Sequence, residues 1–295
     1  MAAGRFVSRF PLPWVQGVGA AAGFLVDAVP NRERRIADIN ISACLPEFEA
    51  VDRRRLRRRA LMEGGKLMLE MPVAWFRSHR DWIESIDYAD FGQHARVLLK
   101  QGKGLIVVAP HLGNWEVGLH GLAEIARVTV LYRPPRQQSL EPVLIAGREA
   151  AGIHLVPIAQ HGLKAMYAAL RKGEMVVITP DQTPRPEFRG AGVYAPFFGL
   201  PALTMTLISQ LARRTGAPVA YAFAERHDQG GRFTIRWKDA DPAIADEDLE
   251  QAATALNAGV EACIRRRPEQ YLWTYKRFKQ SPGAGGIYSR NKRGS

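Results

Sequence analysis

The sequence predicts an α/β fold, a mostly parallel central sheet flanked by helices with a helical extension at the N-terminus. Short apolar runs bounded by glycine or proline recur after residue 104, as expected for buried parallel strands. Segments with helical periodicity lie between these runs, and strands that alternate with helices are typical of a sheet covered by helices. A hydrophobic fraction of 46% over 295 residues is enough for a sizeable core.

Four apolar runs and one alternating run are the candidate strands. The clearest, at residues 104–110, is "GLIVVAP", a continuous apolar run with β-branched residues. Similar runs occupy residues 127–132, 175–180 and 217–225. Residues 232–237 read "RFTIRW", and this alternation predicts an edge strand.

The intervening helices follow from apolar periodicity. In residues 161–172 the apolar side chains lie at offsets 0, 3, 4 and 7, which is one face of a helix: Leu163, Met166, Tyr167 and Leu170. Residues 203–215 and 246–266 are two more predicted helices. Residues 31–100 are predicted to be helical and basic.

Residues 1–35 are interpreted as a membrane-proximal anchor segment, followed by a single domain over residues 36–295. The stretch 11–30 has about the length that crosses a hydrocarbon core. However, it is rich in glycine and alanine, contains Gln16 and Asp27, and has proline at both ends. We expect an interfacial or weakly spanning helix, with a buried helix of the domain as the alternative.

The charge balance indicates an anionic partner. Lys and Arg number 41 against 29 Asp and Glu, a net charge of +12, which suits nucleic acid, an acidic protein or an anionic membrane face. Residues 53–59 contain six arginines interrupted only by Leu56. They surround the helix, so they form either a solvated turn or a contact with an anionic bilayer, where each contributes roughly 1 kcal/mol.

The most informative motif is "HLGNWE" at residues 111–116. His111 follows the first strong strand, and ligands of open α/β sheets bind at this carboxyl edge. Gly113 permits a tight turn and Asn114 is a good N-cap for the next helix. With a turn between them, the Glu116 carboxylate can fold back on the imidazole, fix its tautomer and raise its basicity. We therefore predict a His111–Glu116 dyad; the alternative is a surface pair.

Two further strand ends point to the same crevice. Arg133 follows the strand 127–132 and suits a phosphate or carboxylate through bidentate hydrogen bonds. Asp181 follows the strand 175–180, with Gln182 beside it, and either positions Arg133 or contacts a substrate. Each charged residue has a structural ion pair as its alternative role.

Two aromatic segments have open interpretations. Residues 195–206, "APFFGLPALTMT", place two phenylalanines in a Gly/Pro loop, which predicts either a mobile apolar lid or a buried loop. Residues 271–279, "YLWTYKRFK", are either an interfacial aromatic-basic patch or a C-terminal strand with cations reaching the solvent.

Several catalytic motifs are missing from the sequence. Without a G-x-S-x-G elbow, a serine acyl-enzyme is unsupported. Without G-x-G-x-x-G or a P-loop, nucleotide chemistry is unsupported. Glu116 and His120 are four residues apart, but the zincin spacing is missing, so we predict no metal site and no cofactor.

Together the motifs resemble the bacterial lipid A late-acyltransferase family. Four blocks occur in the family's order between about residues 34 and 279: "APHLGNWE", "YRPP", "DQTP…APFFGLPALTMT" and "YLWTYKRFK". The resemblance implies a glycerolipid-acyltransferase-like fold, His111 and Glu116 as the catalytic pair, and Arg133 and Asp181 as further active-site residues. We expect Gln182 and Asn114 to bind substrate with them.

The resemblance also implies the reaction. The donor would be acyl-acyl carrier protein and the acceptor an anionic Kdo-bearing lipid A precursor. The chain would be associated with the bacterial inner membrane, with its catalytic domain on the cytoplasmic side. His111 would deprotonate the acceptor hydroxyl as it attacks the thioester, so no metal and no covalent enzyme intermediate are required.

Two alternatives stay open at this point. One keeps the reaction and changes the acceptor to another glycolipid, a lysophospholipid or an aminolipid. The other is a nucleic-acid-binding protein that uses the arginines of residues 53–59; it leaves the turn at residues 111–116 unexplained, and we expect no nucleic-acid partner.

Overall fold

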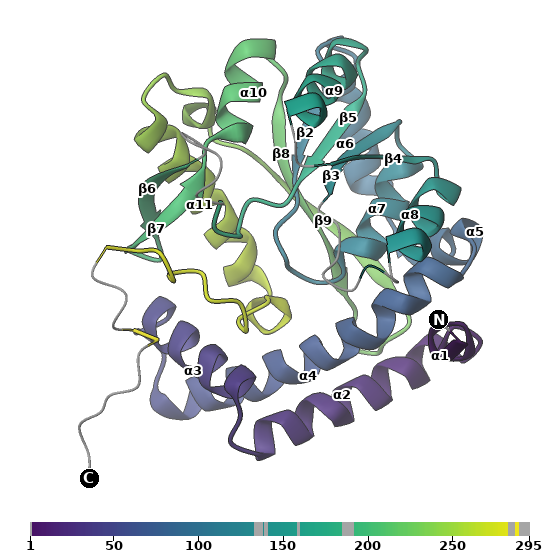
Figure 1. Cartoon of the computed structure of the whole chain (residues 1–295), viewed down its shortest axis with the longest axis vertical. Coiled ribbons are helices and arrows are strands. Elements are labelled where there is room, and N and C mark those ends of the chain that lie inside the picture. The colour runs from purple at the N-terminus through teal and green to yellow at the C-terminus, as the bar shows by residue number, and fades with distance from the viewer. Residues whose placement is uncertain are drawn as a thin grey trace.

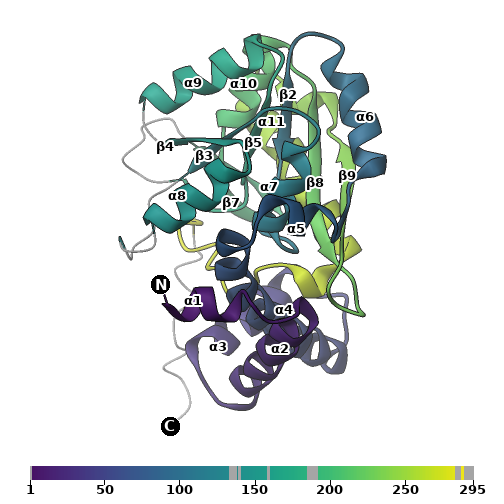
Figure 2. The same cartoon turned by 90° about the vertical axis from the view of Figure 1, so that its right-hand side faces the viewer.

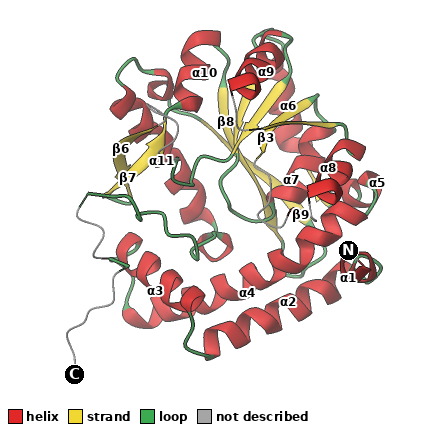
Figure 3. Ribbon diagram, in the orientation of Figure 1, coloured by secondary structure: helices red, strands yellow, loops and turns green. Residues whose placement is uncertain are grey.

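A seven-stranded sheet forms the centre of the computed structural model, which describes residues 2–132, 138, 141–157, 160–184, 192–282 and 287–288. Its strand order is β1-β9-β8-β2-β5-β3-β4, with helices on both faces and a layer of N-terminal helices below it (Figures 1 and 3). All neighbouring pairs are parallel except β8 with β9. The predicted fold class is confirmed.

The middle of the sheet is made by three of the predicted strands. β2 (Leu105–Val108) and β5 (Met175–Ile178) are buried throughout and pair in parallel, with Val108 beside Ile178. β8 (Val219–Arg226) lies on the other side of β2. Continuous burial on both faces explains why β2 and β5 are apolar at every position and why β8 is apolar as far as Ala224.

The outer strands are partly those predicted. β3 (Val128–Tyr132) was expected, whereas β4 (Ile153–Pro157) forms an edge that the sequence did not reveal. β9 (Phe233–Asp239) is not the edge strand that its alternation predicted, because the two-residue strand β1 (Ile86–Asp87) pairs with it on the outer side.

The segment predicted as a mobile lid or a buried loop is an ordered hairpin. β6 (Gly192–Phe197) and β7 (Leu200–Met205) form a second, antiparallel sheet, and helix α11 (Leu249–Arg266) packs against it. Phe197 and Phe198 are buried, and Glu261 accepts the Phe198 N–H at 2.6 Å. The lid interpretation is wrong and the alternative of burial is confirmed, because both rings belong to the core.

Alternate side chains of the strands divide the core into two halves. Ile106 and Val108 point to the face covered by α9 (Gln160–Arg171), α10 (Leu207–Thr215) and α11. Leu105 and Val107 point to the face covered by α5 (His79–Ile83), α6 (Ala89–Leu99) and α7 (Trp115–Ala123). The helix predicted at residues 161–172 is confirmed, whereas those predicted at 203–215 and 246–266 begin later, at Leu207 and Leu249, because residues 203–205 belong to β7 and a short 3-10 turn precedes α11. Helix α8 (Glu141–Ala150) packs beside α4 and β4.

The N-terminal extension is a layer of helices packed on one another. α1 (Ala2–Val7) precedes α2 (Leu12–Ala28), and α2 lies along α4 (Ala50–Phe76) (Figures 1 and 2). Between α2 and α4 in the chain, α3 (Arg32–Cys44) follows a bend at the end of α2. Glycines make the α2–α4 approach close, since a Cβ added at Gly23 would lie 2.1 Å from the Leu61 carbonyl oxygen.

Ion pairs use part of the arginine cluster inside this layer. The Asp27 carboxylate of α2 accepts from Arg57 Nε at 2.8 Å and from Arg58 Nε at 3.0 Å, and Arg57 also binds Asp38. Arg57 is buried, so it belongs to neither a solvated turn nor a membrane contact. Asp27, the one charged residue in the stretch 11–30, therefore joins α2 to α4.

Within the described residues, no helix alone combines the length and apolar character needed to cross a membrane. Helices α2 and α3 meet those two requirements only as a pair, with a bend of 82° between them.

Packing of α2 on α4 can be tested with two alanine substitutions in one helix. Gly23→Ala places a methyl group against the Leu61 carbonyl, so we expect destabilisation by about 1–3 kcal/mol through overpacking. At Gly17 nothing lies within 4 Å of the added Cβ, and Gly17→Ala should be neutral or stabilising by roughly 0.5–1 kcal/mol. Urea unfolding followed by circular dichroism measures both. Equal stability of the two variants would contradict this packing.

Candidate functional site

The register of two parallel strands brings His111 and Asp181 together. Val108 and Ile178 are paired, and each functional residue lies three positions further along its chain. His111 Nδ1 is 2.7 Å from Asp181 Oδ1, and the His111 backbone N–H donates to Asp181 Oδ2 at 3.0 Å. Both carboxylate oxygens are therefore occupied by one histidine.

These contacts define the protonation of the pair. Burial alone would raise the pKa of Asp181, but the charge and hydrogen bonds of His111 hold it below its usual range. An ionised carboxylate can only accept, so in the neutral imidazole Nδ1 carries the proton and Nε2 carries the lone pair. Gln182 Nε2 lies 3.1 Å from His111 Nε2, and the Gln182 amide N–H donates to this lone pair. The imidazole thus presents a basic nitrogen away from the carboxylate.

The turn after β2 has the predicted geometry. Gly113 has a φ of 65°, and a Cβ there would lie 1.9 Å from the Ala224 carbonyl oxygen, so a side chain is excluded. Asn114 caps α7 by accepting the Val117 N–H at 3.1 Å, and its amide donates to Glu70 at 2.8 Å. The turn and the cap are confirmed. Because the Asn114 side chain is buried in these contacts, its role in substrate binding stays a prediction.

Glu116 has different partners from those expected. Its buried carboxylate accepts from Arg148 Nε at 3.0 Å and from Trp75 Nε1 at 3.1 Å. Burial would raise the pKa of Glu116, but the Arg148 guanidinium outweighs burial and holds it below its usual range. The expectation that Glu116 folds back on the imidazole is corrected, because Asp181 takes the place at Nδ1 of His111.

A histidine pair lies beyond Glu116. His120 and His79 approach at 2.9 Å between their Nδ1 atoms, and Glu124 binds His79 Nε2 at 2.6 Å. Burial and the neighbouring His79 lower the pKa of His120 to about 4, so His120 is neutral at pH 7. In the part of the chain that the structure describes, no three His, Cys, Asp or Glu residues are arranged to hold a metal ion.

A buried network fastens the turn to the helical layer, and no sequence signal indicated it. Glu70 of α4 is fully buried and accepts from Arg226 Nε at 2.8 Å, from Gln16 at 2.7 Å and from Asn114. These partners are separated by 44 to 156 positions along the chain. Spacing within a motif cannot reveal contacts at such separations.

The predicted site residues are thus divided in space. His111, Asp181 and Gln182 are brought together, while Glu116 and Asn114 lie behind the turn. Arg133 lies outside the described residues, and its substrate contact stays a prediction.

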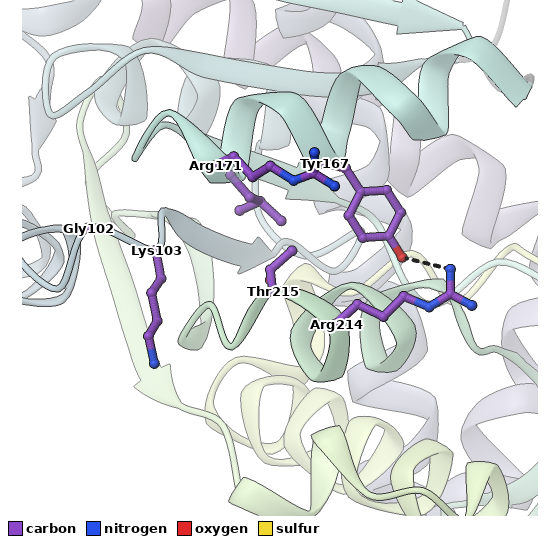
Figure 4. A pocket seen from close by; sticks show the side chains of 7 residues that line it. Gly102, Lys103, Tyr167, Arg171, Arg214 and Thr215 are labelled. Atoms are coloured by element: carbon purple, nitrogen blue, oxygen red, sulfur yellow. Dashed lines mark hydrogen bonds between the residues drawn. The ribbon is translucent and has the colours of Figure 1, made fainter.

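A pocket of about 540 Å³ lies at the end of the sheet opposite to His111 and Asp181, and Figure 4 shows the side chains that line it. Lys103 precedes β2, Arg171 precedes β5 and Thr215 precedes β8, so this pocket is at the amino ends of the parallel strands. His111 and Asp181 follow the carboxyl ends. The concave surface and the histidine–aspartate pair are therefore separate features.

A histidine held by a buried carboxylate at the carboxyl edge of an α/β sheet is the arrangement expected of an enzyme with an imidazole base. The chain belongs to the bacterial lipid A biosynthesis acyltransferase family, whose sequence profile matches residues 1–280. It is accordingly an O-acyltransferase of lipid A biosynthesis.

Three curated relatives from Escherichia coli (strain K12) are similar over nearly the whole chain. The lipid A biosynthesis lauroyltransferase is 28% identical over 280 residues, covering 94% of this chain and 89% of the relative. The palmitoleoyltransferase is 28% identical, with 95% and 90% covered. The myristoyltransferase is 23% identical, with 96% and 85% covered. The predicted family is confirmed.

The Glu116–Arg148 pair should contribute to stability as one unit. Removing either charge leaves the other buried without its partner, so Glu116→Gln and Arg148→Gln should each cost about 3–5 kcal/mol. The double variant should cost less than the sum of the two. Because the pKa of Glu116 is lowered, this contribution should be complete above about pH 5 and decrease as acid protonates the carboxylate.

Urea unfolding of both single variants and the double variant measures the coupling. Arg80→Gln is the control, since Arg80 and Glu84 form an exposed pair 3.8 Å apart whose loss should cost at most about 1 kcal/mol. Additive losses at residues 116 and 148 would contradict a shared buried pair.

Proposed function

We propose that this enzyme transfers a fatty acyl chain from an acyl thioester to a hydroxyl of a lipid A precursor, with His111 as the general base. The observation that carries the proposal is the 2.7 Å contact between His111 Nδ1 and the buried Asp181 carboxylate. This contact leaves the lone pair on Nε2, and the ring retains 12% of its side-chain surface exposed, so a substrate can reach it.

In this mechanism Nε2 takes the proton from the acceptor hydroxyl as the oxygen attacks the thioester carbonyl. The carbon–sulfur bond then breaks, and the imidazolium returns the proton to the departing sulfur. Asp181 stabilises the transient imidazolium and fixes the ring, as the carboxylate of a hydrolase triad does. The acyl group passes directly to the acceptor, without an acyl-enzyme.

Gln182 supports the position of the acceptor. Its amide donates to Nε2 in the free enzyme, at the place where the acceptor hydroxyl must donate during the reaction. We propose that the hydroxyl displaces this amide, which is then free to bind the acceptor. Arg133, one residue beyond β3, is proposed to bind an anionic group of a substrate.

The proposed donor is acyl-acyl carrier protein. The net charge of +12 suits an acidic carrier, and the names of the three relatives specify lauroyl, palmitoleoyl and myristoyl chains. An anionic lipid precursor is the proposed acceptor. Nucleic acid is a poorer partner, because Arg57 and Arg58 of the arginine cluster bind Asp27 within the protein.

The proposed site of action is the cytoplasmic face of the bacterial inner membrane. The side of α2 that faces away from α4 exposes large apolar side chains, including Trp14 at 69%, Val18 at 64% and Leu25 at 63%. Met68 of α4 is 67% exposed. Apolar side chains on a helix that packs by its other face are suited to burial in the boundary of a bilayer.

The proposed base is tested by two substitutions. His111→Ala removes the proton acceptor and should lower turnover about 10²–10⁴-fold. Asp181→Asn should lower turnover by a similar factor. The His111 backbone N–H would donate to the oxygen of the new amide, so the amide NH₂ would face His111 Nδ1. The ring would then have to protonate Nε2, which destroys the base. Turnover with purified acyl-acyl carrier protein and lipid A precursor measures both.

The double variant separates the two possible partners of His111. If Asp181 acts through the ring, Asp181→Asn should add little to His111→Ala. Full activity of Asp181→Asn, with Glu116→Gln as severe as His111→Ala, would instead support Glu116 as the partner. The proposed donor is tested by comparing acyl-acyl carrier protein with an acyl-CoA that carries the same acyl chain. Equal turnover with both donors, at low and at high salt, would contradict a preference for the carrier protein.

The outer face of α2 is tested on vesicles. A Trp14→Ser/Leu25→Ser variant should bind anionic phospholipid vesicles at least about tenfold more weakly, since each large apolar side chain contributes roughly 1.5–3 kcal/mol when buried. Val97→Ser is the control, because Val97 is 57% exposed on α6, outside the helical layer. Vesicle sedimentation measures the binding, and equal loss in both variants would contradict a specific role of α2.

A further inference from the structure

The C-terminal segment, residues 270–278, touches both halves of the site. On one side it pairs with the turn that carries His111: Gly113 N–H donates to Gln270 O at 3.1 Å, and Leu272 N–H donates to His111 O at 3.0 Å. Leu112 and Tyr271 form an isolated antiparallel bridge between these two bonds. The backbone of His111 is therefore held by this segment.

The same segment holds the loop that carries Asp181. Thr183, two residues after Asp181, donates its backbone N–H to the Tyr275 hydroxyl at 3.0 Å. The Thr183 hydroxyl donates to the Arg277 carbonyl at 3.2 Å. Both bonds come from one threonine, and the Tyr271 side chain of the same segment also hydrogen-bonds to the Asp181 carboxylate.

The C-terminal segment is itself anchored on two sides. Asn40 of α3 is buried and donates to the carbonyls of Trp273 at 2.6 Å and Tyr275 at 2.8 Å. The buried Arg277 guanidinium donates to Leu203 O at 2.6 Å and to Thr204 Oγ1 at 2.9 Å, on β7. Neither the interfacial patch nor the strand suggested by its sequence describes this segment, which is an irregular and largely buried connection.

We propose that the C-terminal segment sets the distance between His111 and Asp181, with Tyr275 as a positioning residue that acts through Thr183. The inference rests on the proposed roles of His111 and Asp181. Strand register alone brings the two residues to the same edge, but each lies three residues beyond its strand. Residues 270–278 contact both loops, so this segment can hold the 2.7 Å contact between them.

Tyr275→Phe tests the proposal, because it removes only the hydroxyl that accepts the Thr183 N–H. The ring of Tyr275 is half-buried, so its body can stay in place. We expect kcat to fall about tenfold or more with KM for the donor unchanged, since displacement of a catalytic group by 1 Å costs up to about 10²-fold. Thr183→Val removes the hydroxyl that donates to the Arg277 carbonyl, so it should also lower kcat.

Tyr194→Phe is the matched control. The Tyr194 hydroxyl donates to Gln280 O at 2.7 Å, so the variant loses the same chemical group near the same end of the chain. Its bond lies outside residues 270–278 and does not reach Thr183. Thermal unfolding of all three variants separates a loss of stability from a loss of positioning.

The imidazole Nδ1–H proton resonance of His111 supplies a readout that stability does not move. It should shift or broaden in Tyr275→Phe and Thr183→Val and stay unchanged in Tyr194→Phe. A normal kcat in Tyr275→Phe, or a reduced kcat with the resonance unchanged, would overturn the positioning role. If His111→Ala proves active, the proposed function fails, while the resonance still decides whether Tyr275 positions the pair.

Discussion

The buried ion pair between Glu70 and Arg226 is the interaction on which the rest of the structure depends. Both side chains are almost completely buried, and a buried charge without its partner costs several kcal/mol. Burial would raise the pKa of Glu70, but Arg226 outweighs it and lowers this pKa, so the carboxylate stays ionised. Since Gln16 and Asn114 bind the same carboxylate, one charge joins α2, α4, the end of β8 and the start of α7.

This network explains how an apolar helical layer and a catalytic edge are combined in one protein. Asn114 both caps α7 and binds Glu70, so the turn after His111 cannot move without disturbing a buried charge. Through Gln16 the same carboxylate fixes α2, whose outer face exposes apolar side chains. The surface proposed to contact the membrane and the proposed base are therefore joined through one buried network.

Glu116 and Asp181 differ in the charged group that each carboxylate binds. Glu116 lies in the first turn of α7, where Arg148 and Trp75 occupy its oxygens. Asp181 has no arginine bound to it among the described ion pairs, and both of its oxygens accept from His111. A buried carboxylate already neutralised by a guanidinium is a weak partner for an imidazolium, whereas an ionised carboxylate whose described ion pair is with the histidine stabilises it.

The sequence by itself determined the class of the fold, the strands β2, β3, β5 and β8, the cap at Asn114, the family, and the location of His111 and Asp181 at one edge. These features follow from local patterns, since apolar runs, capping residues and strand ends are read within a few positions. Only the tertiary structure decided which carboxylate binds His111, that Phe197 and Phe198 belong to the core, and that residues 270–278 connect the two loops of the site. Each of these outcomes depends on groups tens of positions or more apart in the chain, and strand register, burial and charge pairing bring such groups together only when the chain is folded.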